Sequence, residues 1–512
     1  MGSPETSSPD PGDPDPGGPA GDDPATGASG EAIPTPSLTG NEGQGGAASA
    51  PGASGGTPVA TGGASGAPGA PEFEQDDPSL HPPDTSYDRV EIPAEVTNVM
   101  SIDIDDRDRV YVLERTGGLK IWYPAERRVV DAGSIPVFSG NEDGALNIRL
   151  DPAFSTNGWA YIYYSSTLSN ENVLSRFDIV ADVLDRASEK VLLRVPDQRE
   201  ERYHVAGGMD FDAQGNLFLA AGDNTDPFGS NGFSPHDERP GRQIWDSQRS
   251  AANSRDLRGK ILRIKPSPDG SYEIPEGNLF TEGEGAPEIY TMGNRNPFRI
   301  AVDPVKGWLY WGEVGPDAGD NSEALTTRGP RGYDEVNQAK GPGFFGWPYC
   351  IGNNVPYVYV DFANNLASRG PFDCNAPVNQ SPNNTGVREL PPAQPAWIAY
   401  SYGTSPYPAL GTNGGRTAIV GGVYRWKPGG SPNKLPRYFD GSVIFLEFIR
   451  NRMAEVRTDD EGNIVAVNDL FASFTWNAMI QARISPSGVL HVAQFGAAST
   501  VYRMNYVGVV AP

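Results

Sequence analysis

The stretch that decides the fold is MDFDAQGNLFLAAGD, residues 209–223. Apolar and polar side chains alternate at its start, a polar turn with Gly215 follows, and a second apolar run ends at Asp223. Alternation with a period of two is typical of a half-buried β-strand, and Asp, Asn and Gly favour the backbone conformations of tight turns. The stretch therefore predicts a strand–turn–strand unit.

The same unit recurs along the chain. It is found again at 100–122, 148–164, 300–315, 421–448 and 482–496, and the unit at 421–448 carries a longer insertion. Six units of one kind predict an all-β, six-bladed β-propeller with long loop insertions. Two β-sandwiches are the alternative, although sandwich strands need not repeat in kind. In a propeller, ligands bind at the mouth of the central channel, so we expect the chemistry in the long insertions before Ile300 and Gly421.

The N-terminal region has a different composition. Residues 1–80 contain twelve Asp and Glu and no Lys or Arg, which is about half of the net charge of −25. Gly, Pro, Ala and Ser dominate there, and such a segment cannot bury enough apolar surface to offset the entropy of ordering it. We predict a disordered tether over residues 1–85 and the propeller over residues 86–512.

Charge and hydropathy exclude several classes of partner. The part after the tether is also acidic, which argues against binding to nucleic acid or to an anionic membrane surface. No apolar run reaches the roughly 18 residues of a transmembrane segment. A tether of this kind is typical of secreted or lipid-anchored bacterial proteins. We therefore expect an extracellular or periplasmic protein whose leader is absent from this chain, with the tether available to carry a lipid anchor.

The two cysteines, Cys350 and Cys374, lie in a region rich in Gly, Pro and Asn. One disulfide that pins a long loop is the interpretation we favour, and two unpaired buried thiols are the alternative. Two cysteines alone cannot form a structural zinc site. A disulfide would suit an oxidising compartment.

Several stretches resemble the glucose/sorbosone dehydrogenase family. They are GRQIWDSQRSAANSRDLRGKILRIKP (241–266), EIYTMGNRNPFRIAVDP (288–304), GEVGPDAG (312–319), GYDEVNQAKGPGFFGWPYC (332–350) and GGRTAIVGGVYRW (414–426). The resemblance runs from about residue 90 to 508. It implies a six-bladed propeller that oxidises an aldose or related small sugar with pyrroloquinoline quinone (PQQ) and calcium, and that passes the electrons to a separate acceptor.

By position, the resemblance also implies roles for individual residues. His204 would be the general base, and Asp223 would orient it. Arg295 and Asn296 would contact the quinone. The backbone carbonyls of Gly315 and Pro316 would bind calcium. Further cofactor contacts fall on Thr417, more loosely on Arg450, and on Glu142, which stands where a glutamine is familiar.

The residue types fit this chemistry. A neutral imidazole can take a hydroxyl proton as a hydride leaves, and a carboxylate on its other nitrogen fixes the tautomer. A guanidinium such as that of Arg295, together with a divalent cation, would stabilise negative charge that develops on quinone oxygens. Calcium prefers oxygen ligands, including backbone carbonyls. We expect His204 and Arg295 to converge on one pocket.

Some positions depart from the family pattern. Tyr203, Glu142 and Val314 stand where polar groups suited to an anionic cofactor are familiar, and a carboxylate at Glu142 would repel an acidic cofactor. Asp317 and Asp320 either assist metal binding or form a solvated loop. Of the other histidines, His236 is interpreted as a loop residue, His491 as a residue on a strand face and His81 as part of the tail.

Two other functions stay open at this point. A propeller of the same family could bind carbohydrate without oxidising it, or it could be a calcium-dependent hydrolase such as a lactonase. A hydrolase would need a ring of Asp, Glu and Asn side chains around a metal in the channel, and fold alone does not choose between these functions.

Overall fold

We describe the protein from a computed structural model, which covers residues 79–93, 95–200, 203–322, 324, 329–412 and 414–508. The predicted tether therefore lies outside the described residues, apart from its last seven positions. Among the described residues, none of the helices combines the length and apolar character needed to cross a bilayer. The short α1 (Phe154–Asn157) accompanies 3₁₀ turns at Asp84–Ser86, Ser230–Gly232, Gln243–Trp245, Phe362–Asn364, Pro408–Leu410 and Arg437–Phe439.

Six strands form a closed ring at the centre of the fold. Each packs against the next, and the last packs against the first. In chain order they are β2 (Val99–Ile104), β6 (Ala145–Leu150), β10 (Ala206–Phe211), β15 (Pro297–Val302), β24 (Ala418–Val423) and β28 (Met479–Ile484).

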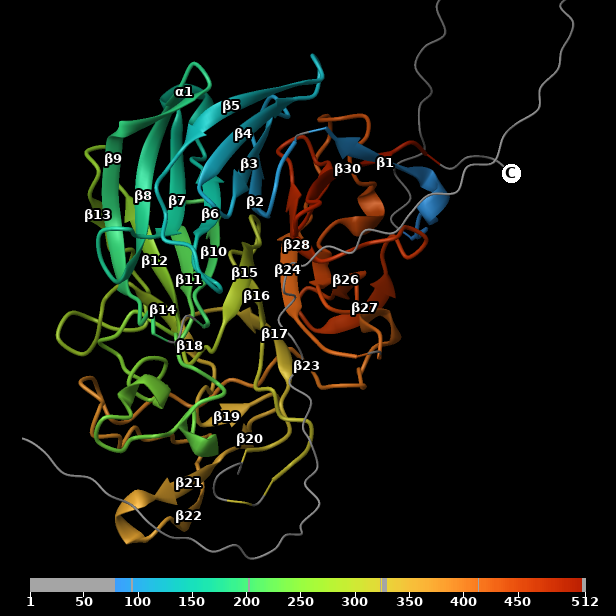
Figure 1. The fold of residues 1–512 in the computed structure, drawn as a ribbon. Coiled ribbons are helices and arrows are strands. Elements are labelled where there is room, and N and C mark those ends of the chain that lie inside the picture. The colour runs from blue at the N-terminus through green and yellow to red at the C-terminus, as the bar shows by residue number, and fades with distance from the viewer. Residues whose placement is uncertain are drawn as a thin grey trace, which may run out of the picture. The chain divides into compact units, whose positions relative to one another are not determined.

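Each inner strand continues outward into one sheet, which is one propeller blade (Figure 1). The first two blades add β3 (Val110–Glu114), β4 (Gly118–Tyr123) and β5 (Arg128–Ser134), then β7 (Trp159–Ser165), β8 (Glu171–Val180) and β9 (Val183–Pro196). The third adds β11 (Leu217–Ala221), β12 (Lys260–Pro266), β14 (Ile289–Met292) and β18 (Gly343–Phe344), with β13 (Tyr272–Glu273) beside β12. The fourth and fifth add β16 (Leu309–Glu313), β17 (Asp334–Ala339) and β23 (Ile398–Tyr400), then β25 (Val443–Glu447), β26 (Arg452–Thr458) and β27 (Ile464–Asp469).

The sixth blade joins the two ends of the propeller. Its inner strands are β28, β29 (Leu490–Gln494) and β30 (Thr500–Tyr506), and its outermost strand is β1 (Tyr87–Ile92). β1 pairs antiparallel with β30, with Tyr87 opposite Tyr506 and Ile92 opposite Val501. Main-chain hydrogen bonds between the first and last strands thus complete the ring.

The repeat found in the sequence corresponds to the inner part of each blade. All six predicted units contain the two innermost strands of one blade, so the six-bladed propeller is confirmed and the two-sandwich alternative is wrong. One detail differs from expectation, because the strands are not half-buried. Every residue of β2 and β11 is buried, since both faces of these strands are covered.

Long insertions leave the blades at two places. Residues 222–259 connect β11 to β12, and residues 345–397 connect β18 to β23. The second insertion contains two hairpins, β19 (Cys350–Ile351) with β20 (Val355–Pro356) and β21 (Val358–Asp361) with β22 (Ala367–Pro371), which lie below the sheets in Figure 1. Cys350 and Cys374 form a disulfide in this insertion, as predicted.

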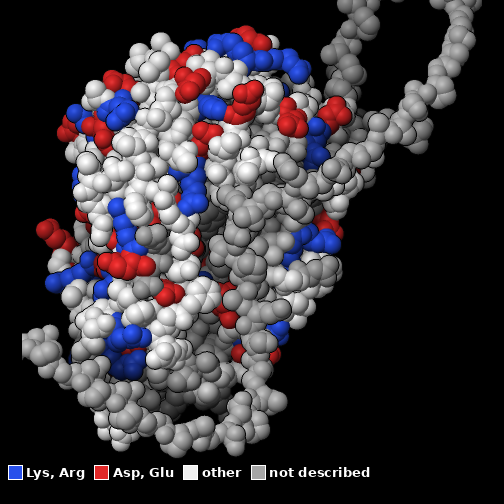
Figure 2. Space-filling model, in the orientation of Figure 1, with Lys and Arg blue, Asp and Glu red and all other residues white. Residues whose placement is uncertain are grey.

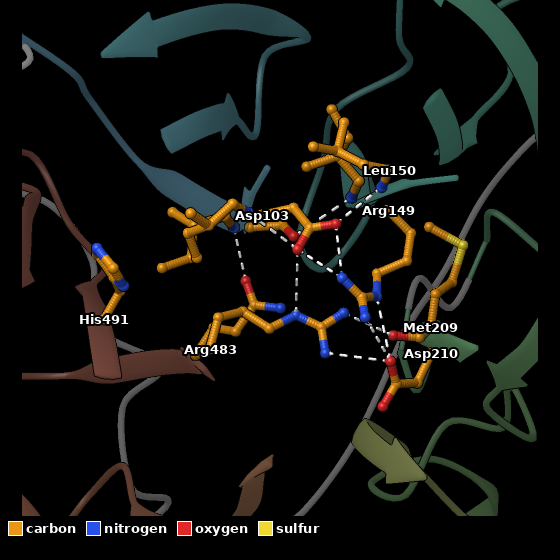
Figure 3. Close-up of polar contacts among 12 residues, drawn as sticks. Asp103, Arg149, Leu150, Met209, Asp210, Arg483 and His491 are labelled. Atoms are coloured by element: carbon orange, nitrogen blue, oxygen red, sulfur yellow. Dashed lines mark hydrogen bonds and ion pairs between the residues drawn. The ribbon is translucent and has the colours of Figure 1, made fainter. Parts of the chain in front are cut away.

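A buried ion network ties the inner strands together near their carboxyl ends (Figure 3). Asp103, Arg149, Asp210 and Arg483 are the penultimate residues of β2, β6, β10 and β28. Arg149 donates to both carboxylate oxygens of Asp103, at 2.5 and 2.6 Å, and to Asp210 at 2.7 Å. Arg483 reaches the same Asp210 oxygen at 3.5 Å, and the backbone N–H of Val302 in β15 donates to the other at 2.9 Å. The network therefore connects five of the six inner strands.

The outer surface is different in character. On the face drawn in Figure 2, Lys and Arg side chains are interspersed with Asp and Glu side chains and do not gather in one broad basic patch.

Removing the central cation of the network should destabilise the fold strongly. In Arg149→Met, the buried carboxylates Asp103 and Asp210 lose their main partner, so we expect the free energy of unfolding to fall by about 3–5 kcal/mol in urea denaturation. Arg194→Met is the matched control. Arg194 pairs with Glu171 at 3.0 Å at the surface, where the Arg194 side chain is 50% exposed and the Glu171 side chain is 32% exposed. The free energy of unfolding of this control should fall by at most about 1 kcal/mol. Equal losses in the two variants would contradict the role of the network.

Candidate active site

A histidine–aspartate pair lies at the amino end of β10. His204 Nδ1 is 2.7 Å from Asp223 Oδ1, and both side chains are buried. His204 has a positive φ of 55°, and its carbonyl passes so close to residue 222 that a Cβ there would lie 1.9 Å from the oxygen. Glycine at position 222 is therefore what allows the histidine to approach Asp223.

Asp223 is the centre of a set of fixed hydrogen bonds. Its Oδ2 accepts from Ser247 Oγ and from Trp347 Nε1, both at 2.7 Å, and its Oδ1 also accepts from the backbone N–H of Thr225 at 3.1 Å. Burial alone would raise the pKa of Asp223, but His204, Ser247 and Arg295 together hold it below its usual value. An ionised Asp223 can only accept, so a neutral His204 ring carries its proton on Nδ1 and leaves Nε2 free to accept one.

Arg295 lies beside this pair, in the turn between β14 and β15. Its carbonyl accepts from the backbone N–H of Asp223 at 2.8 Å, and its Nη1 donates to the carbonyl of Val314 at 2.8 Å. Its Nη2 is buried, has no hydrogen-bond partner among the described residues, and is 3.9 Å from Asp317 Oδ2. The Oδ1 of the adjacent Asn296 is also buried and has no partner within the described part of the chain. Polar atoms of this kind need a ligand or water, since an unpaired buried polar group is costly.

The histidine and the arginine line one pocket of about 190 Å³. The expected convergence of His204 and Arg295 is therefore present in the structure. The other lining residues all come from the two insertions and the loop after β16, namely Asp223, Thr225, Pro227, Phe228, Gly232, Ser234, Pro235, Pro316, Asp317, Ala318, Gly329, Trp347 and Tyr357.

Comparison with known proteins identifies the family. Residues 96–364 match the sequence model of the family described as Glucose / Sorbosone dehydrogenase. This match covers more than half of the chain. The chain belongs to the glucose/sorbosone dehydrogenase family.

Relatives within the family are distant. Aldose sugar dehydrogenase YliI of Escherichia coli is 25% identical over 250 residues, which are 48% of this chain and 57% of the relative, so the match spans little more than half of that protein. Quinoprotein glucose dehydrogenase B of Acinetobacter calcoaceticus is 24% identical over 419 residues, which are 70% of this chain and 80% of the relative.

Solved structures share the fold. The apo form of soluble aldose sugar dehydrogenase from E. coli has a TM-score of 0.55 at 17% identity, and it covers 82% of this chain and 99% of its own. The PQQ-bound form of aldose sugar dehydrogenase from Streptomyces coelicolor has a TM-score of 0.52 at 16% identity, with 83% and 99% covered.

Four positions that the family resemblance assigned to the cofactor do not line the pocket, namely Glu142, Asn296, Thr417 and Arg450. Glu142 accepts from the backbone N–H of Val205 at 3.2 Å, so it lies beside the histidine's backbone. Thr417 donates its hydroxyl to the carbonyl of Arg416 at 2.6 Å. The guanidinium of Arg450 donates to four backbone carbonyls, those of Ser401, Leu410, Gly411 and Gly415. These bonds give Arg450 a structural function in its loop.

The carbonyls expected to bind calcium already have a cationic partner. Arg416 donates through Nη1 to the carbonyl of Gly315, at 3.4 Å, and through Nη2 to that of Pro316. Among the described residues, no three His, Cys, Asp or Glu side chains gather in a way that could hold a metal ion. With a guanidinium on both carbonyls, Gly315 and Pro316 as arranged here do not fit calcium.

Both acids of the nearby loop are exposed, but only Asp317 lines the pocket with Arg295, and it accepts from the hydroxyl of Tyr402 at 2.7 Å.

The other histidines lie away from the His204–Asp223 pair. His491 is fully buried in β29, where burial and the charge of Arg503 lower its pKa to about 3. His236 is buried in the first insertion, with Nε2 2.9 Å from the carbonyl of Pro348. His81 lies against the ring of Tyr438. None of the three lines the pocket among the residues described.

Sequence reasoning missed the groups that hold Asp223. Ser247 and Trp347 lie in the family-like stretches 241–266 and 332–350, but their spacing from Asp223 along the chain carries no periodic signal. The insertion that contains Trp347 also carries the disulfide, and this was the one available hint that the loop is held in place.

Next to Glu142 lies a carboxyl group that should make stability depend on pH. Asp143 is fully buried, and burial together with the charge of Asp197 raises its pKa from 3.8 to about 7. Between these values the folded protein keeps a proton that the unfolded chain loses, so the free energy of unfolding falls as pH rises from about 4 to about 7.

The variant Asp143→Asn cannot titrate at this position. We measure the free energy of unfolding in urea at about pH 5 and about pH 8. The wild type should lose at least about 1.4 kcal/mol more than the variant over this range, which corresponds to a tenfold change in one proton-binding constant. The same pH dependence in both proteins would show that Asp143 does not hold this proton.

Proposed function

We propose that this protein oxidises an aldose or a related small sugar, with PQQ as the cofactor and His204 as the general base. The observation that carries the proposal is the oriented His204–Asp223 pair in one pocket with the unpartnered Nη2 of Arg295. Membership of the glucose/sorbosone dehydrogenase family supports it.

The pocket fits an anionic, planar cofactor. Arg295 has a buried N–H group without a partner, and a guanidinium suits a carboxylate or a quinone oxygen. Trp347 and Tyr357 contribute aromatic surface to the pocket. Arg295 would therefore hold the cofactor, and the family resemblance adds a contact from Asn296.

Each residue of the site then has a defined task. PQQ, when bound, supplies the quinone that accepts the hydride. His204 Nε2 removes the proton of the sugar hydroxyl as the hydride leaves the same carbon. Asp223 holds the ring in the required tautomer and stabilises the imidazolium that forms. Arg295 stabilises the negative charge that develops on the acceptor.

The proposal also covers the electron acceptor and the compartment in which the protein works. A separate acceptor would reoxidise the cofactor. We also propose that the protein works outside the cytoplasm, because the Cys350–Cys374 disulfide suits an oxidising compartment.

Replacement of the base tests the assignment directly. In His204→Ala, sugar-dependent dye reduction after loading with PQQ should fall by about 10²–10⁴-fold, because the proton acceptor is lost. PQQ binding, followed by quenching of tryptophan fluorescence, should persist. His81→Ala is the matched control and should keep full activity.

Two results would contradict the proposal. One is wild-type activity in His204→Ala. The other is a wild-type protein that binds sugars but not PQQ under any condition, which would favour a carbohydrate-binding propeller.

Replacement of the orienting carboxylate should act through the histidine. In Asp223→Asn, the amide can turn the imidazole to the wrong tautomer, so kcat/KM should fall by roughly 100-fold or more. Ser247→Ala removes only one hydrogen bond to Asp223, so its kcat/KM should fall by less than roughly tenfold. A larger loss in Ser247→Ala than in Asp223→Asn would contradict this order.

A further inference from the structure

One buried arginine stands where a metal was expected. The guanidinium of Arg416 contacts the carbonyl oxygens of both Gly315 and Pro316. Backbone carbonyls are hard oxygen donors that bind either a calcium ion or an N–H group. Here a single cationic side chain engages both of them.

The arginine is held in this position from several sides. Its Nη1 is paired with Asp334, and the two side chains are 1% and 0% exposed. Its guanidinium carbon lies 4.3 Å from the centre of the Tyr402 ring. Asp334 in turn accepts from the backbone N–H of Gly315 at 3.0 Å and of Ala418 at 2.9 Å. The arrangement is a closed network, and Arg416 cannot leave without exposing Asp334 as an unpaired buried charge.

The backbone leaves room for this side chain. A Cβ at Gly332 would lie 1.7 Å from the carbonyl oxygen of Pro316 and 2.6 Å from Arg416 Nη2. Any larger residue at position 332 would therefore push the guanidinium away from the carbonyl. The space next to the two carbonyls is fitted to Arg416.

Among the described residues, the carboxyl groups beside these carbonyls already accept hydrogen bonds, including those of Glu313 and Glu335, which line a small cavity with Gly315 and Pro316. The Asp334 oxygens are engaged by Arg416 and two backbone N–H groups. Asp317 accepts from Tyr402 and faces Arg295. A divalent cation bound to Gly315 and Pro316 would lie against a fixed positive charge inside the protein, where repulsion is poorly screened.

We infer that Arg416 takes the place of the divalent cation, so that the site binds its quinone cofactor without calcium. This inference rests on the proposed function. The permanent charge of the guanidinium lies next to Pro316, which lines the same pocket as His204 and Arg295. Arg416, paired with Asp334, would thereby occupy the cation's position behind the pocket without a metal.

The test compares PQQ binding with and without calcium. PQQ is titrated into the wild-type protein in EGTA and in excess calcium, and binding is followed by quenching of tryptophan fluorescence. We expect the same Kd in both conditions. In Arg416→Met, the affinity in EGTA should fall roughly ten- to hundredfold, and calcium should restore part of it.

Controls keep the result interpretable. Arg331→Met removes a nearby arginine that donates to the carbonyl of Tyr402 and should leave both Kd values unchanged. If Arg416→Met does not fold, the double variant Arg416→Met, Asp334→Asn retains the charge balance and takes its place. Terbium, titrated alone and followed by its luminescence, should bind at this position in the Arg416 variant and not in the wild type.

The outcomes separate the two proposals. Wild-type protein that binds PQQ only with calcium overturns the inference about Arg416 and leaves the proposed function intact. Wild-type protein that binds PQQ in neither condition overturns the proposed function. Terbium binding to Gly315 and Pro316 in the wild type also overturns the inference, whatever the result with PQQ.

Discussion

The buried network of Asp103, Arg149, Asp210 and Arg483 is the constraint on which the rest of the structure depends. Hydrophobic packing between blades is not directional, so by itself it does not fix how one inner strand is registered against the next. Charged groups at the same position of four inner strands do fix it, because a displaced carboxylate would be left unpaired inside the protein. With the carboxyl ends of the strands locked, their opposite ends are held at fixed positions, and the loops that carry His204 and Arg295 start from there.

The pocket uses a second buried carboxylate in the same manner. Asp223 binds His204, Ser247 and Trp347, which come from the turn before β10 and from two separate insertions. One ionised group thus gathers three segments and also sets the tautomer of the imidazole. Positioning and proton chemistry depend on the same hydrogen bonds, so a change that loosens one is expected to impair the other.

The propeller fold could be predicted from the sequence because one strand–turn–strand pattern is repeated. Each inner strand pair alternates around a polar turn, as in 209–223, and six copies of the pattern left little choice of architecture. The pairing of His204 with Asp223, nineteen residues later, came from the family resemblance, not from the repeat. The role of Arg450 was not, because its partners are backbone carbonyls, which every residue has. Arg416 was overlooked for the same reason, as its contacts with Gly315 and Pro316 join positions about a hundred residues apart and involve no side chain of theirs.

The pairing of β1 with β30 has a mechanical consequence. Because Tyr87 lies opposite Tyr506, the chain enters and leaves the propeller at one corner. A force that separates the two ends of the propeller at that corner would break the hydrogen bonds between β1 and β30 one after another and not all together. The sixth blade would therefore open first, and the blades that follow His204 and Arg295 would stay folded until β1 and β30 had separated.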